Sequence, residues 1–336
     1  MAHHSTPLKF LFPGWFSLVM GLAGLAAAWH QAQPLMGEMA GAVALVVGLV
    51  AGATLALLSL ASALRLQRHP QAWAEDLRHP MRHVMVATLP IAAMQVAGVG
   101  VALAGPLPWI AALWWVGSLG QFVVTVWVMG RWWLGHQAGG LTWSVVTPAL
   151  FIPIVGNVLA PLGGVPLGYP EWSAAQFGVG LLLWPVVQTM LMVRLAAQGS
   201  WPARAQPGIF IFIAPPAVVG LAALHFGAPA LWVWMCWGTA LFSFLWVATQ
   251  TRAILALPFG LPHWGMSFPL TALAALTLRL ATPGGLLAVL GPALLALASL
   301  VILGLLAATL RGLRDGSLLA PEPVAPIVAV GAVGAG

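Results

Sequence analysis

The chain has 336 residues, of which 61% are hydrophobic and only 5% are charged, and its mean hydropathy is +0.98. This composition is typical of a membrane protein and excludes a soluble enzyme. The formal charge of +6 does not indicate nucleic-acid binding, because the basic residues are spread one or two per loop instead of being gathered on one face.

The chain contains ten apolar stretches, each long enough to cross a bilayer as a helix, and it is predicted to be an all-α polytopic membrane protein. The first stretch lacks a small-residue cleavage site followed by polar sequence, so we expect it to remain as a span and not to be removed as a signal peptide. The predicted spans cover residues 12–29, 39–64, 84–104, 109–129, 144–162, 173–196, 208–226, 231–250, 264–280 and 286–310.

Positive charge is divided unequally between the two sets of connections. Eleven of the twelve Lys and Arg residues lie in or at the border of one set of alternate connections, and only Arg279 borders the other set. By the positive-inside rule, the eleven mark the cytoplasmic side of the inner (plasma) membrane, and an even number of spans places both termini there. The predicted organisation is a cytoplasmic N-terminus at 1–11, a transmembrane channel domain at 12–310 and a cytoplasmic C-terminal tail at 311–336.

Proline occurs inside four of the odd-numbered spans, several residues from either end. These residues are Pro90, Pro153, Pro215, Pro216 and Pro269. A proline within a span removes one backbone hydrogen bond and frees a carbonyl one turn earlier, which in lipid must find a partner or face a water-filled cavity. The pattern predicts an inner ring of odd-numbered helices around a central path, with the even-numbered helices as an outer shell.

The predicted path is lined by neutral residues. The odd-numbered spans carry hydroxyl and amide side chains, but no Asp, Glu, Lys or Arg in their central turns. Coupled transporters usually keep an ionisable residue at mid-depth, so its absence favours a passive conduit. The predicted pore-lining residues are Thr88, Pro90, Pro153, Asn157, Pro215, Pro216, Ser267, Pro269 and Thr271. A positive cytoplasmic mouth favours an anion as the permeant, and its predicted residues are Arg78, Arg82, Arg131 and Arg252.

Catalytic and metal-dependent classes find no support in the side chains. A single cysteine, Cys236, excludes a cysteine-cluster metal site, and no His-Glu-x-x-His pattern is present. None of the nine histidines lies in the middle of a predicted span, where a haem ligand or the base of an intramembrane serine protease would have to be. We therefore predict neither an enzyme nor a cofactor or metal site.

Five segments contain distinctive residue orders, mostly around these prolines. They are Phe-Pro-Gly-Trp-Phe-Ser from residue 12, Asp-Leu-Arg-His-Pro-Met-Arg-His from 76 with Thr-Leu-Pro-Ile from 88, Thr-Pro-Ala-Leu-Phe-Ile-Pro-Ile-Val-Gly-Asn from 147, Ile-Ala-Pro-Pro-Ala from 213, and Trp-Gly-Met-Ser-Phe-Pro-Leu-Thr from 264. In this order and at these positions they resemble the TehA family of tellurite-resistance and dicarboxylate transporters, which includes the slow-type anion channels of plant guard cells.

The resemblance implies ten helices in five helical hairpins around a central pore, and a homotrimer in which each subunit has its own pore. It also implies a phenylalanine in span nine that blocks the pore until it swings aside. Phe268, directly before Pro269, matches this gate. The family often has a proline inside helix one, where this chain has Val19-Met20-Gly21, so helix one is expected either to bend at Gly21 or to remain straight.

These observations together predict an anion channel or facilitative anion transporter gated by Phe268. Its partners would be the lipid bilayer and small inorganic or C4-dicarboxylate-type anions, and a role in tellurite resistance or export is among those the resemblance implies. The residues leave chloride, nitrate, sulfite, malate and tellurite open. The alternative is a proton-coupled transporter of C4-dicarboxylates (malate) or sulfite on the same fold.

Overall fold

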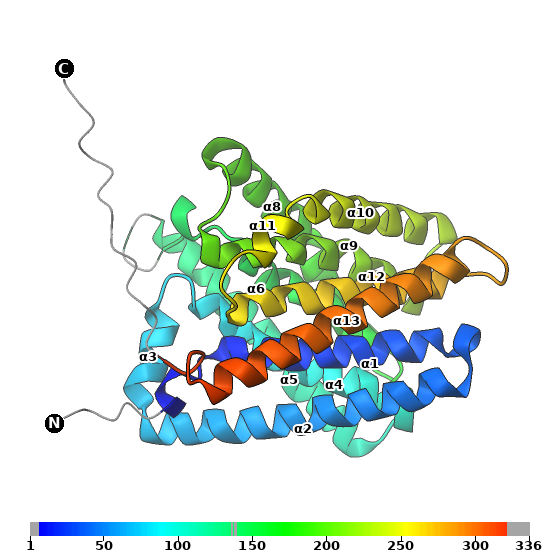
Figure 1. The fold of residues 1–336 in the computed structure, drawn as a ribbon, viewed down its shortest axis with the longest axis horizontal. Coiled ribbons are helices and arrows are strands. Elements are labelled where there is room, and N and C mark those ends of the chain that lie inside the picture. The colour runs from blue at the N-terminus through cyan, green and yellow to red at the C-terminus, as the bar shows by residue number, and fades with distance from the viewer. Residues whose placement is uncertain (1–6, 136, 138–139, 321–336) are drawn as a thin grey trace.

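The computed structural model describes residues 7–135, 137 and 140–320, and within them all regular structure is helical. Ten passes form five helical hairpins, which confirms the predicted fold class (Figure 1). Both ends of the described chain lie at the same end of the bundle, which we call the termini face. Residues 1–6 of the predicted N-terminus and 321–336 of the predicted tail lie outside the described residues.

The five even-numbered passes are long, continuous helices on the outside of the bundle. In the best apolar window of each, only 22–33% of the residues are buried, so most of the window is available to lipid. Two of these helices contain a proline, Pro185 or Pro292, without interruption of the helix. The helices are α2 (Glu38–Arg68), α5 (Pro108–Gly130), α8 (Pro170–Gln198), α10 (Ala230–Ala248) and α13 (Leu287–Arg314).

The five odd-numbered passes are not single α-helices, and each begins with 3-10 turns before the first α-helical segment. The first is η2 (Pro13–Phe16) and α1 (Ser17–Met36), and the third is η3 (His83–Ala87) and α4 (Thr88–Ala104). The fifth pass is broken into η6 (Pro148–Leu150), α6 (Phe151–Val155), η7 (Gly156–Leu159) and α7 (Ala160–Gly164). The seventh is η8 (Ala203–Ile213) and α9 (Ala214–His225), and the ninth is η9 (Leu261–Met266) and α12 (Ser267–Leu280).

The inner prolines occupy the same position in four of these passes. Pro90, Pro153, Pro216 and Pro269 are each the third residue of an α-helical segment that follows 3-10 turns. In the first turn of a helix the missing N–H has no intrahelical partner to lose, so proline is tolerated there. The prolines therefore mark the change from 3-10 to α geometry within each inner pass.

The inner passes form a closed ring. α1 contacts α4, α4 contacts α7, α7 contacts α9, α9 contacts α12, and α12 returns to α1. Burial follows the same division, because 61% of the best window of His83–Ala104 and 78% of that of Ala203–His225 are buried. The ring thus lies inside the shell of outer helices, as the proline pattern predicts.

Length and composition identify seven membrane-spanning helices, with Pro148–Gly164 as a shorter apolar helix. The other two passes are more polar: α1 ends with His30, Gln31 and Gln33, and η9–α12 contains His263 and Arg279. These polar residues lie on inner passes, where neighbouring helices and not lipid surround them.

A glycine with positive φ lies in the turn of every hairpin at the end opposite the termini face. The five are Gly37, Gly105, Gly168, Gly227 and Gly284, with φ between 69° and 89°. Glycine adopts this left-handed backbone without steric penalty, which permits the tight reversals between inner and outer helices.

The longest predicted cytoplasmic connection contains an additional helix, α3 (Pro70–Arg78), which is held by a buried ion cluster. Asp76 is 1% exposed, and its carboxylate lies 2.7 Å from Arg65 Nη2 and 3.0 Å from Arg82 Nη1. Arg65, itself 2% exposed, also donates to the carbonyls of Lys9 and Ala72 at 3.0 and 3.3 Å. The cluster joins α2, α3 and the N-terminal segment at the termini face.

Asp76→Ala is expected to lower the unfolding free energy by about 3–5 kcal/mol, because it leaves the buried guanidinium of Arg65 without its counter-charge. The matched control is Glu75→Ala at the exposed neighbouring position. Thermal unfolding of both variants in detergent, followed by the loss of monodisperse protein, measures the difference. Equal melting temperatures would contradict the stabilising role of the cluster.

Candidate functional site

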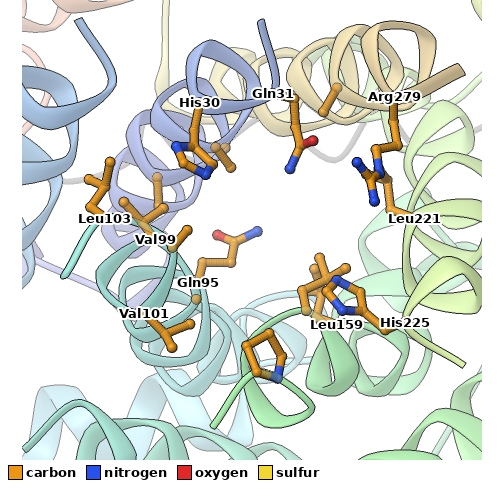
Figure 2. A pocket seen from close by; sticks show the side chains of 18 of the residues that line it. His30, Gln31, Gln95, Val99, Val101, Leu103, Leu159, Leu221, His225 and Arg279 are labelled. Atoms are coloured by element: carbon orange, nitrogen blue, oxygen red, sulfur yellow. The ribbon is translucent and has the colours of Figure 1, made fainter. Parts of the chain in front are cut away.

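A cavity of about 610 Å³ lies inside the ring of inner passes (Figure 2). Its lining comes from α1, α4, η7 and α7, α9 and α12, so all five odd-numbered passes contribute to it. The inner passes run in the same direction, from the termini face toward the opposite face. The cavity is lined by their second halves and therefore lies toward the opposite face.

The floor of the cavity is apolar. Because each inner pass starts at the termini face, its first lining residue in sequence is the one nearest that face. These first residues are Ala23, Met94, Leu159, Leu221 and Phe268. Phe268 is the second residue of α12, at the change from 3-10 to α geometry. The residue matched to the predicted gate thus lies where the cavity ends.

Two glycines of α1 allow α12 to approach it closely at this level. A Cβ added to Gly24 would lie 2.9 Å from Cδ2 of Phe268, and one added to Gly21 would lie 2.7 Å from Cβ of Ser267. Both distances are shorter than real Cβ contacts. The two helices can therefore come this close only because Gly21 and Gly24 carry no side chain. α1 runs from Ser17 to Met36 without interruption at Gly21.

Three hydroxyl residues predicted to line the pore are buried and bonded to backbone carbonyls. Thr88 Oγ1 lies 2.6 Å from the carbonyl oxygen of Pro13 and 2.7 Å from that of Met85. Ser267 donates to the carbonyl of Trp264 at 2.7 Å, and Thr271 donates to that of Phe268 at 2.8 Å. All three are 0% exposed and lie outside the cavity lining, so a pore-lining role for them stays a prediction about an open state.

Asn157 and Pro153 belong to a buried polar network that joins the broken fifth pass to α5 and α8. Asn157 Nδ2 donates to Thr125 Oγ1 at 2.8 Å, and Gln176 Nε2 donates to Asn157 Oδ1 at 3.0 Å. The carbonyl of Pro153 accepts from Gln121 Nε2 at 2.9 Å and lies 2.6 Å from Thr125 Oγ1. Side chains of even-numbered helices therefore satisfy backbone groups that the interrupted helix leaves free.

The remaining predicted lining prolines are buried within the helical packing. Pro90 faces α5, because a Cβ added to Gly117 would lie 2.7 Å from the Pro90 carbonyl oxygen and one added to Gly120 would lie 3.2 Å from Pro90 Cβ. Pro215, Pro216 and Pro269 are buried at the starts of α9 and α12. These residues do not line the cavity either, so their lining role stays a prediction.

The arginines predicted at the mouth lie at the termini face, where two of them hold structure together. Arg82 pairs with Asp76, and Arg131 donates to the carbonyl of Leu77 at 2.7 Å. Arg78 and Arg252 are exposed on α3 and α11 (Thr251–Leu255). All four positive charges remain at this face, but they are not gathered around the cavity.

The cavity also has polar lining residues, and the sequence did not predict that they lie together. His30 and Gln31 come from α1, Gln95 from α4, His225 from α9 and Arg279 from α12 (Figure 2). Arg279 had one distinguishing feature in the sequence, because it is the only Lys or Arg at the far-side ends of the predicted spans. Among the described residues, no group of three or more His, Cys, Asp or Glu side chains is placed to hold a metal ion.

A family model described as a voltage-dependent anion channel matches residues 11–310, from the first pass into the last turns of the tenth. The tellurite resistance protein TehA homolog of Haemophilus influenzae is 26% identical over 277 residues, covering 81% of this chain and 82% of that protein. The S-type anion channels SLAH2 and SLAH3 of Arabidopsis thaliana are each 26% identical, over 62% and 59% of this chain. The matched segments span only 40% and 31% of the two plant proteins.

Gly24→Val is expected to destabilise the protein by about 1–3 kcal/mol, because its side chain would be forced into Phe268 and Thr271 across the α1–α12 contact. Gly52→Val, in the middle of α2 with no atom within 4 Å of an added Cβ, is the control for a glycine-to-valine change in a membrane helix. Melting temperatures of the purified variants measure the effect. A shift at Gly24 no larger than that at Gly52 would argue against the close approach.

Proposed function

Since the chain belongs to the voltage-dependent anion channel family, we propose that it conducts small anions passively through its central path and that Phe268 closes this path. The observation that carries the proposal is the cavity inside the ring of inner passes, which ends on Phe268 at an apolar floor. A ring of this kind gives an ion a route shielded from lipid, and an apolar constriction stops it by excluding water.

The charges around the cavity favour an anion. No Asp or Glu is among its lining residues, and Arg279 is the one side chain there with a permanent charge. A cation would meet no negative partner along the described lining. The family is one of anion channels and transporters, and we propose no catalytic role for the cavity.

The position of Phe268 supports a movable gate. Its side chain is partly buried and faces Gly24, which presents no side chain, and its own carbonyl accepts the hydroxyl of Thr271. Pro269 follows directly, so the backbone at Phe268 sits at a break in regular α geometry. Rotation of one ring would open the floor without movement of a whole helix.

The assembly and location follow the predictions from charge and resemblance. We propose three subunits, each with its own path, in the inner (plasma) membrane with both termini in the cytoplasm. The outer helices support contacts with lipid or neighbouring subunits, since they expose large apolar side chains such as Leu49, Leu182 and Leu231. A role in tellurite resistance, after the name of the Haemophilus relative, is one of the cellular functions that this conduit would serve.

One observation favours the coupled alternative, a proton-driven transporter of C4-dicarboxylates or sulfite. His30 and His225 both line the cavity, and histidine is the side chain whose ordinary pKa lies nearest neutrality. A proton carried on either imidazole would accompany an anion into the same space. The two mechanisms differ in whether flux depends on the proton gradient.

Phe268→Ala is expected to raise anion flux into proteoliposomes by about tenfold or more, because removing roughly 1.4 kcal/mol from the barrier at the floor is enough for a tenfold change in rate. Phe242→Ala is the control, since Phe242 is 68% exposed on the outer helix α10. Nitrate or chloride flux at a fixed voltage is the measurement. Equal flux in both variants would contradict the gate.

The passive mechanism predicts that flux through Phe268→Ala is unchanged when the proton gradient is removed with an uncoupler at constant voltage. Flux that requires the gradient, and that is lost in His30→Gln or His225→Gln, would instead establish the coupled transporter. Flux with and without the uncoupler is measured on the same proteoliposomes, so the amount of inserted protein cancels in that comparison.

A further inference from the structure

The polar side chains of the cavity point into its space from four different passes (Figure 2). Gln95 is 9% exposed, and among the described residues neither its Nε2 nor its Oε1 has a hydrogen-bond partner. His30 Nδ1 is also buried without a partner there. Buried polar atoms without any partner are costly, so these atoms need water or a ligand that enters the cavity.

Arg279 supplies the charge for such a ligand. Among the described residues it has neither an ion pair nor a hydrogen bond. It lies near the end of α12, on the opposite side of the bundle from the ion cluster of Asp76. Arg279 is exposed, and with no carboxylate in the lining its guanidinium faces the cavity without a counter-charge from the protein (Figure 2).

The donors around Arg279 match the chemistry of a planar oxyanion. A guanidinium presents two parallel N–H groups that fit two oxygens of a carboxylate or nitrate, whereas a halide gains nothing from this geometry. The amides of Gln31 and Gln95 and the imidazole of His225 add further N–H donors around the same space. A volume of about 610 Å³ accommodates a small organic ion, well beyond the size of a single halide.

We propose that Arg279, with Gln31, Gln95 and His225, forms a binding site for planar oxyanions on the side of Phe268 that faces away from the termini. The site lies between the opposite face and the apolar floor, so an anion bound there is held directly before the closed path. This inference rests on the proposed function for its role in conduction, but the site itself binds whether or not the floor opens.

Binding is tested on the purified full chain in detergent, with sodium nitrate and sodium formate as probes and sodium chloride as the spherical reference. Titration of the melting temperature gives a half-saturating concentration for each anion. The comparison is between the native chain, Arg279→Gln, Arg279→Lys and the control Arg314→Gln, an exposed arginine at the termini face. Each salt also changes the stability of all four chains in a general way, and comparing the chains in the same salt removes this effect.

The expected result is that nitrate and formate bind the native chain and Arg314→Gln better than chloride does, and that Arg279→Gln weakens both by about tenfold or more. Arg279→Lys should retain anion binding but lose the preference over chloride, because lysine keeps the charge without the planar fork. Unchanged titrations in Arg279→Gln would overturn the site. A full preference in Arg279→Lys would overturn the assignment to planar oxyanions.

Flux separates failure of the site from failure of the proposed function. In the Phe268→Ala background, Arg279→Gln should lower nitrate flux at sub-saturating concentrations when nitrate is supplied from the face opposite the termini. Binding that depends on Arg279 without any flux in Phe268→Ala would preserve the site and refute the conduit. Flux in Phe268→Ala that is insensitive to Arg279→Gln, with unchanged binding, would preserve the conduit and refute the site.

Discussion

The structure depends on one constraint: inside a membrane every backbone N–H and carbonyl must find a partner away from lipid. The inner passes violate regular α geometry, with 3-10 turns before each α segment and a fifth pass in four pieces. They are tolerated because the continuous outer helices surround them and, at the fifth pass, supply Gln121 and Thr125 to the free carbonyl of Pro153. The division between irregular inner and regular outer helices is what makes a lipid-shielded path available.

The two ends of the path differ in packing: the inner passes are closely packed toward the termini face and enclose a cavity toward the opposite face. Toward the termini face, Gly21 and Gly24 bring α1 onto α12, and hydroxyls such as Ser267 and Thr271 bond to nearby carbonyls, so the ring closes. Toward the opposite face, the passes diverge around the cavity and carry polar side chains without protein partners. Phe268 lies at the boundary between the packed and the open halves, where a single ring has the most effect on passage.

Much of the fold could be predicted from the sequence, because apolar length, proline position and the distribution of Lys and Arg are properties of short segments. The ten passes and the inner ring followed from them. The polar contacts did not: Gln121 and Gln176 lie on even-numbered spans, and only the packing of α5 and α8 onto the fifth pass brings them to Asn157 and its neighbours. His225 and Arg279 lie at helix ends, about fifty residues apart in sequence. Helix α3, with its buried Asp76, falls in a connection between two predicted spans, for which we predicted no helix.

Cysteine accessibility tests the central claim, a cavity open to one face and closed at Phe268, most directly. A single cysteine at Gln95, in a chain whose buried Cys236 is replaced by alanine, is treated with a membrane-impermeant thiol reagent from each side of a vesicle. With Phe268 present, labelling is predicted only from the face opposite the termini; with Phe268→Ala, labelling is predicted from both faces. Labelling from the termini face with Phe268 in place, or none from the opposite face, would contradict it.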